Sequence, residues 1–301
     1  MFGVLRKLYN YCCAKRPRIQ MNKLLILDKS VFQGTAHSEL VRFVKCHRVI
    51  LPHALCVECA ISQKGNPPKN SKDPKQLVQR LLDVVKNGAC AGKSPGKIVE
   101  EERSRNAAIE SLVDIEETQT MREGILDEEP DLEKVREECD KAFKPITDSV
   151  ERWAGQYYKN MVKKELEKSF REEVDEGDLV GRLAKWLQSI DGMKDDLLDH
   201  FLGNRINAMS ADRWEWQLLR LSLAWGIELA SKRNKSGPSF ENYDEISNDI
   251  FDIYYVSHLS QADGLVAGDK RLVRPLAMAA FPCKDVFSSI SDVPYRYCKD
   301  N

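Results

Sequence analysis

The sequence lacks any run of about 18 to 20 apolar residues, the length that a membrane-crossing helix requires. It also lacks an excess of charge, since 46 Lys and Arg against 47 Asp and Glu give a net charge of −1. A membrane protein and a binder with a globally basic surface are therefore not expected. Residues 1–20 are basic with only short apolar runs, unlike a signal peptide, so we expect a cytoplasmic chain with an N-terminal arm.

Paired cysteine spacing is absent as well. The nine cysteines are odd in number and irregularly placed, which is typical of a reducing compartment and not of a disulfide framework. His53-x-x-Cys56-x-x-Cys59 resembles half of a zinc site, but no second pair at short spacing follows it. Buried thiols on an apolar helix are the preferred interpretation.

The two ends of the chain show alternating strand and helix patterns. Near the start, the unbroken apolar run Leu24–Leu27 predicts a strand buried on both faces, as in a parallel sheet. Helical spacing over about 36–46, a short strand at 49–51 and a helix over 52–62 follow it. Near the end we expect a helix over 243–260, a strand at 264–267, a helix over 271–280 and a strand near 286–287.

The middle of the chain has a different character. Residues 63–239 are charge-rich and mostly helical in pattern, with the most apolar helix over 212–229. Trp214, Leu218, Leu221 and Trp225 share one face of that helix, which is typical of core packing. The sequence therefore predicts three parts: an arm at 1–20, a core of 21–62 and 240–301, and a helical insertion at 63–239.

Carboxylates follow the predicted strands. Asp28 comes directly after the first strand, and Asp269 comes just after the strand at 264–267. In an open parallel sheet both side chains then lie at the same edge. Asp249 and Asp252 are three residues apart and share a helix face, and Glu58 lies on the helix after the second strand.

Such carboxylates repel one another unless a cation neutralises them. Hard oxygen ligands favour Mg²⁺ or Mn²⁺, which keep several waters and take further ligands from a phosphate. A bound divalent ion lowers the pKa of a coordinated water and stabilises charge on a phosphodiester during hydrolysis. The candidate ligands are Asp28, Glu58, Asp249, Asp252 and Asp269.

These motifs carry a family resemblance. The stretch from Leu24 to Phe32, a hydrophobic strand followed by Asp28 and Ser30, resembles the first motif of PIN-domain nucleases. The stretch 248–272, with a helix acid, a short apolar strand and an Asp before a new helix, resembles the closing motif. Asp252 has the better spacing to Asp269, and Asp249 is the alternative match for the helix acid. Glu58 matches the acid of the second helix.

The resemblance covers about 21–62 and 240–290, and it implies a PIN-like three-layer α/β fold around a central parallel sheet. It also implies a metal-dependent endonuclease that acts on RNA more often than on DNA, with Ser30 in a supporting role. Ala267 and Gly268 stand where the family often has Thr or Ser, so Ser30 is expected to be the main hydroxyl. The basic residues expected to contact backbone phosphates are Lys29, Lys270, Arg271 and Arg274.

Several partners and functions stay open at this point. Many PIN proteins are toxins held by an inhibitory partner, or serve RNA turnover or defence, so a regulatory protein partner or a homo-oligomer is compatible with the resemblance. A catalytically silent scaffold that binds RNA or protein is one alternative. A structure-selective DNA nuclease is another, although the insertion has no obvious basic, glycine-bearing DNA clamp.

Overall fold

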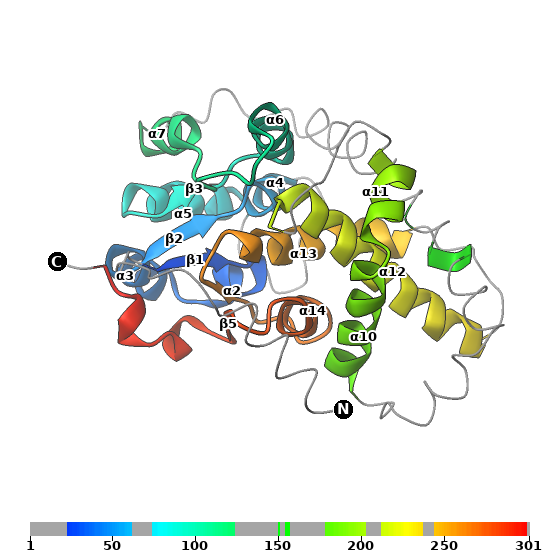
Figure 1. Ribbon diagram of the computed structural model, residues 1–301. Coiled ribbons are helices and arrows are strands. Elements are labelled where there is room, and N and C mark those ends of the chain that lie inside the picture. Colours follow the sequence, from blue (N-terminus) through cyan, green and yellow to red (C-terminus); the bar gives the residue numbers. More distant parts are fainter. Residues whose placement is uncertain are drawn as a thin grey trace.

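The computed structural model describes residues 23–61, 74–123, 150, 154–156, 178–202, 212–236 and 244–299. Five short strands form one parallel sheet in the order β3-β2-β1-β4-β5 (Figure 1). Their bounds are β1 Leu24–Leu27, β2 Arg48–Leu51, β3 Cys90–Ala91, β4 Gly264–Val266 and β5 Asp285–Phe287. The predicted α/β class and parallel sheet are confirmed, with each predicted strand within a residue or so of its expected position.

The central strand explains why the sequence pattern at 24–27 is continuous. Leu25, Ile26 and Leu27 are fully buried, because β1 has a strand on either side and helices over the sheet. Leu25 pairs with Val49 of β2 and with Gly264 of β4. The two ends of the chain, more than 200 residues apart in sequence, are therefore neighbours in the sheet.

The strand order places a switch point between β1 and β4. From β1 the chain continues to β2 and β3 on one side, and it then returns to β4 and β5 on the other side. At such a point the connections leave the sheet in opposite directions and a crevice opens beyond the carboxyl ends of the strands. Both Asp28 and Asp269 follow strands that border this point.

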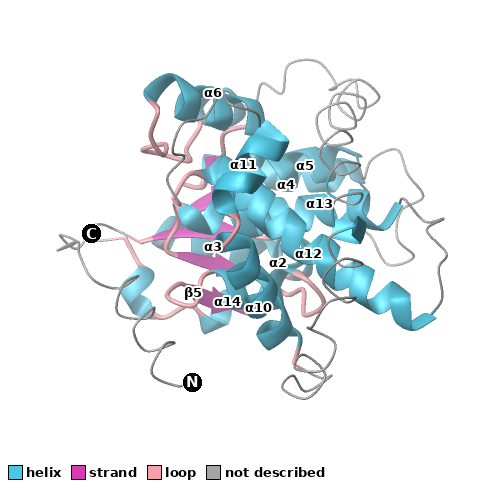
Figure 2. Ribbon diagram, turned by 45° about the vertical axis from the view of Figure 1, so that its right-hand side comes forward, coloured by secondary structure: helices cyan, strands magenta, loops and turns pink. Residues whose placement is uncertain are grey.

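Helices make up most of the remaining described structure. The α-helices are α2 Lys29–Gly34, α3 His37–Cys46, α4 His53–Ile61, α5 Pro74–Lys86, α6 Pro95–Arg105, α7 Ile115–Glu123, α10 Leu179–Asp191, α11 Lys194–Leu202, α12 Trp214–Ser236, α13 Asp244–Ser257 and α14 Val273–Ala280. Three short 3-10 helices follow at η1 His258–Ser260, η2 Ile290–Asp292 and η3 Tyr295–Tyr297. Figure 2 shows the strands side by side, with helices packed beside them.

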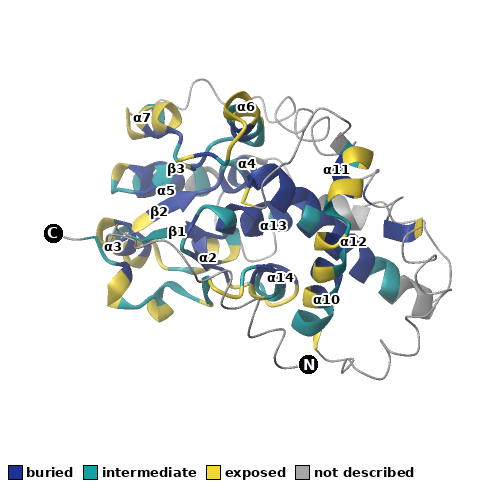
Figure 3. Cartoon of the chain, in the orientation of Figure 1, coloured by how far each residue is buried: buried dark blue, intermediate teal, exposed yellow. Residues whose placement is uncertain are grey.

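Helix α12 lies at the centre of the helical part. It packs against α10 and α13, and α10 also packs against α14. Trp214 and Trp225 are buried, which confirms the core-packing interpretation of the aromatic stripe. In Figure 3, α12 and α13 are mostly buried, whereas α6 and α11 have exposed outer faces. Through α12, the predicted insertion packs directly onto α13, the helix that carries Asp249 and Asp252.

Two elements were not predicted. Strand β3 lies inside the stretch expected to be helical, and only its pairing with Ile50 and Leu51 makes it a strand, because two residues carry no periodicity. Helix α2 begins directly after Asp28, in a stretch for which the sequence predicted no element. The arm at 1–20 and most of the loops predicted at 63–75 and 234–240 lie outside the described residues. Within the described residues, no helix is long and apolar enough to cross a membrane.

Candidate functional site

The ends of β1 and β4 are tied together at the switch point. The backbone N–H of Asp28 donates to Val266 O at 3.0 Å, one rung beyond the last strand pair. The Ser30 hydroxyl donates to Asp28 Oδ2 and accepts from the Gly268 N–H at 2.9 Å. A Cβ at position 268 would lie 3.0 Å from Ser30 Oγ, so glycine permits this close approach. Ser30 thus joins the Asp28 carboxylate to the turn after β4, and its supporting role in a site stays a prediction.

Asp28 is almost completely buried, with 2% of its surface exposed. Burial raises its pKa from 3.8 to about 6, because a charged carboxylate loses hydration there. The hydrogen bonds from Ser30 lower this pKa, whereas the negative charges of Glu58 and Asp269 raise it. Both of those acids were predicted to share a site with Asp28, and their electrostatic effect shows that they lie near it.

Asp252 is the most strongly perturbed of the acids. Its pKa is raised to about 8, first by burial and then by the charges of Asp269, Asp28, Glu58 and Asp249, in that order. The other four acids that the sequence selected therefore lie within electrostatic range of Asp252. Asp249, on the same helix face, makes the smallest of these charge contributions to the pKa of Asp252. Asp252 is therefore favoured over Asp249 as the central helix acid.

Glu58 is held by two neighbours. Lys29 Nζ forms an ion pair with Glu58 Oε1 at 3.0 Å, and the Tyr255 hydroxyl donates to Glu58 Oε2 at 2.7 Å. Tyr255 is fully buried on α13, three residues after Asp252. Glu58 thus connects α4, α2 and α13, and both of its oxygens are engaged. The sequence did not indicate Tyr255, although its spacing from Asp252 places both on one helix face.

Asp249 is also held on two sides. The Trp225 indole N–H donates to Asp249 Oδ2 at 2.8 Å, and the Arg271 guanidinium contacts both carboxylate oxygens. Asp249 is 3% exposed, so its charge depends on these donors. It therefore links α12, α13 and the turn before α14. Trp225 was predicted to be a core residue, and its role as a donor to Asp249 was missed because α12 and α13 meet only in the tertiary structure.

Asp269 follows β4 and precedes α14. Its Oδ1 accepts hydrogen bonds from the backbone N–H groups of Leu272 at 2.7 Å and Val273 at 3.1 Å. This bonding orients the carboxylate at the start of α14, where backbone N–H groups favour negative charge. Asp269 can therefore orient the start of α14 and also belong to the group of acids, because its charge raises the pKa values of Asp28 and Asp252.

A divalent cation fits the chemistry of three of these acids. Asp28, Asp252 and Asp269 follow or lie on three different elements and supply hard oxygen donors. The charge of Asp269 raises the pKa values of Asp28 and Asp252, so a cation among the three would relieve repulsion. Among the described residues, however, no three His, Cys, Asp or Glu side chains are arranged closely enough to enclose one ion. Side-chain movement at the site would have to accompany ion binding.

The basic residues predicted to contact phosphate lie in different environments. Lys29 is paired with Glu58 and Arg271 with Asp249. Lys270 is exposed beside Asp269. Arg274 is half-buried on α14, and its Nε atom has no hydrogen-bond partner among the described residues. Lys270 and Arg271 are thus the two exposed cations of this group.

Two other groups of residues lie outside the site. Asp263 Oδ2 accepts from the Leu24 N–H at 2.9 Å, so it ties the amino ends of β1 and β4. Cys59 is buried on α4, and burial raises its pKa to about 12. Burial also raises the pKa of Cys56. Both shifts agree with the predicted buried, unreactive thiols.

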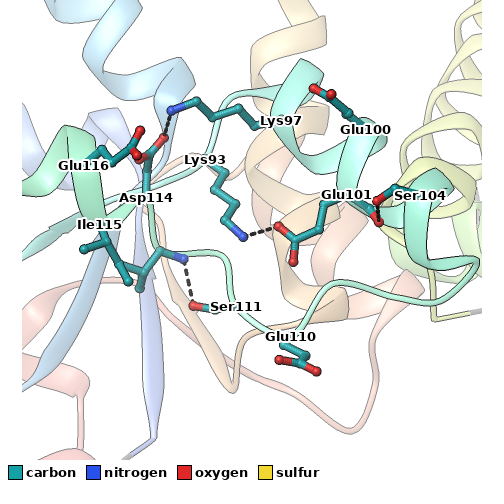
Figure 4. Close-up of a pocket in the computed structure, with 11 residues that line it drawn as sticks. Lys93, Lys97, Glu100, Glu101, Ser104, Glu110, Ser111, Asp114, Ile115 and Glu116 are labelled. Atoms are coloured by element: carbon teal, nitrogen blue, oxygen red, sulfur yellow. Dashed lines mark hydrogen bonds and ion pairs between the residues drawn. The ribbon is translucent and has the colours of Figure 1, made fainter.

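A second charged region lies between α6 and α7. It is a hollow of about 610 Å³ lined mainly by charged side chains (Figure 4). Lys97 pairs with Asp114 at 2.7 Å, and Lys93 pairs with Glu101. Burial alone would raise the pKa of Asp114, but hydrogen bonds from Lys97 and from the Glu117 N–H lower it overall. Asp114 and Glu101 are thus each paired with a lysine, whereas Asp28 at the switch point lies near the like charges of Glu58 and Asp269.

No protein-family model, curated protein or solved structure matches this chain. Its functional assignment therefore depends on its motifs and on the geometry at the end of the sheet.

Proposed function

We propose that this protein is a divalent-metal-dependent endonuclease of the PIN type, which hydrolyses phosphodiester bonds in RNA in preference to DNA. The observation that carries the proposal is the position of Asp28, Asp252 and Asp269 at the switch point of a parallel sheet, where the charge of Asp269 raises the pKa values of Asp28 and Asp252. Acids that destabilise one another in this way are typical of functional sites.

The roles of the acids differ. Asp28, Asp252 and Asp269 would hold Mg²⁺ or Mn²⁺. Glu58 and Asp249 lie at the edge of this group, and their bonds to Lys29, Tyr255, Trp225 and Arg271 hold the surrounding elements in place. Either could still complete the coordination through a water molecule. When bound, the ion would supply a water of lowered pKa and neutralise charge on the phosphate.

The remaining groups of the site orient the acids or bind the phosphates of the substrate. The Ser30 hydroxyl holds the Asp28 carboxylate against the end of β4. Lys29 directly follows Asp28 and Lys270 directly follows Asp269, and both supply positive charge for the phosphates of a nucleic acid. Helix α12 buttresses α13 through Trp225, so the helical part of the chain supports the acids as well as covering them.

The experiment measures cleavage of single-stranded RNA and DNA with Mg²⁺, Mn²⁺ or EDTA. Wild-type protein is compared with Asp28→Asn and Asp269→Asn, and with Asp263→Asn as a matched control at the opposite edge of the sheet. We expect cleavage by the wild type and the control with either ion, and loss of at least about a hundredfold in the two site variants, because even outer-shell changes at metal sites cost ~10- to 100-fold.

Cleavage that survives EDTA and both site substitutions would exclude the metal-carboxylate mechanism. Binding of RNA without cleavage under any condition would favour a catalytically silent scaffold instead. Cleavage of branched or flapped DNA in preference to RNA would favour the structure-selective DNA nuclease. Circular dichroism of each variant shows whether it is folded before its activity is interpreted.

A further inference from the structure

Arg271 makes the most unusual contact at the candidate site. It lies two residues after Asp269, and its guanidinium reaches back to α13. There it contacts both oxygens of Asp249, and its Nη2 atom lies 3.6 Å from Asp252 Oδ2. A single arginine therefore bridges the two acids that share a face of α13.

The two acids hold Arg271 unequally. Asp249 is buried and is fixed from the other side by the Trp225 indole N–H, so its contact with Arg271 has a defined geometry. Asp252 meets the same guanidinium at a longer distance and has a side chain that is 25% exposed. The contact with Asp252 is therefore the weaker of the two and can be lost while that with Asp249 remains.

Arg271 also has the freedom to move. Its side chain is 61% exposed, and among the described residues it is the one basic side chain in contact with Asp252. The other charged side chains that act on Asp252 are carboxylates, which are negative like Asp252 itself. A guanidinium in this place supplies part of the neutralisation that a bound cation would supply.

We propose that Arg271 is a built-in counter-cation of the site: it neutralises Asp249 and Asp252 when no divalent ion is bound, and the ion displaces it from Asp252. This inference rests on the proposed function. After displacement the guanidinium stays anchored to Asp249 and faces the crevice, where it can bind a substrate phosphate. Arg271 is thus a positioning residue that competes with the ion and then assists substrate binding.

Competition between Arg271 and the ion predicts that a loss of positive charge at position 271 strengthens ion binding. Replacing Arg271 by Gln should tighten Mn²⁺ binding, because the ion no longer has to displace a cation from Asp252. Lys270→Gln is the matched control, since it removes the same charge from the adjacent, exposed position. We expect R271Q to bind Mn²⁺ about three- to tenfold more tightly than K270Q in calorimetric titrations, the range of a partly exposed ion pair.

Two further measurements separate this role from a structural one. With EDTA, R271Q should unfold at a lower temperature than K270Q, and the difference should shrink when Mn²⁺ is added. In steady-state cleavage, R271Q should have a raised KM for RNA with a smaller change in kcat. Arg271→Lys keeps the charge but loses the forked geometry, so it should give intermediate Mn²⁺ affinity and serves if R271Q does not fold.

Equal Mn²⁺ affinity of R271Q and K270Q would overturn the counter-cation role and leave the nuclease proposal intact. Weaker Mn²⁺ binding by R271Q would overturn it too, because Arg271 would then support the ion site and not compete for it. Absence of Mn²⁺ binding by the wild type and every variant would overturn the proposed function and this inference together.

Discussion

Buried carboxylates occur in two regions of this protein, in opposite surroundings. In the helical part, Glu228 of α12 is fully buried and receives hydrogen bonds from Arg182 and the Trp186 indole. Glu102 of α6 is also fully buried and accepts the backbone N–H groups of Trp214 and Glu215 at the start of α12. Each acid has its own donors, and each joins two helices.

At the end of the sheet, acids face other acids. Asp28 and Asp252 have raised pKa values to which neighbouring carboxylates contribute. A fold retains such repulsion only where the rest of the structure outweighs it, and functional sites are where this most often occurs. The comparison teaches that burial of an acid does not by itself indicate function. What distinguishes the site is burial together with several neighbours of like charge, four around Asp252 against the single Glu215 beside Glu102.

The largest effect is expected in the helical part. Glu228→Gln should destabilise the protein by about 3 kcal/mol, because it leaves the half-buried Arg182 without its counter-charge. Chemical denaturation at pH 7 measures the change, with the exposed Glu100→Gln on α6 as the control. A loss no larger than that of the control would show that Glu228 is not a structural acid, and the contrast between the two regions would fail.

Asp252→Asn should stabilise the protein, in contrast to Glu228→Gln. The folded protein holds the proton of Asp252 up to a pKa of about 8, whereas the unfolded chain releases it near 3.8. The ionised acid therefore opposes folding, and this cost grows as the pH rises from 4 to 8. In EDTA, the variant should be more stable than wild type by about 1 to 3 kcal/mol at pH 8 and equal to it at pH 4. A variant that is less stable at pH 8 would contradict the repulsion.

Trp225→Phe tests the link between the two regions. It removes the indole N–H that reaches Asp249, and we expect a loss of about 1 to 2 kcal/mol beyond that of a matched control. Trp214→Phe is that control, because Trp214 is equally buried and its indole N–H has no hydrogen-bond partner among the described residues. Thermal denaturation of both variants gives the difference. Equal losses would mean that the hydrogen bond to Asp249 contributes nothing.

The smallest effect is expected at the hollow between α6 and α7. Asp114 has a lowered pKa overall, so its ionised form favours folding above pH 4, and this contribution disappears as the pH falls below that value. Asp114→Asn should cost at most about 1 kcal/mol at pH 7, because Lys97 is half-exposed and solvent screens the pair. Its pH dependence should run opposite to that of Asp252→Asn in the same denaturation series. If the effects of both substitutions on stability changed with pH in the same direction, the contrast would be lost between Asp114, which is paired with Lys97, and Asp252, which has like-charged neighbours.

The sequence by itself determined the strands of the sheet core and the order of the motif acids. Leu24–Leu27 could be identified as a buried strand because apolar residues on both faces leave no alternation. The position of Asp28 after β1 and of Asp269 after β4 followed from the same local patterns. These features depend on near neighbours in the chain, and composition and spacing record them directly.

Only the tertiary structure decided which acids repel and which are satisfied. Asp249 and Asp252 are alike in sequence, yet Trp225 and Arg271 donate hydrogen bonds to the first, whereas the second has a longer contact with Arg271 and several like-charged neighbours. The same holds for Glu58, whose partner Tyr255 is almost 200 residues away. Strand β3 likewise exists through its pairing with β2 alone. Partners from distant segments set the energy of a buried charge, and local sequence carries no record of how those segments pack.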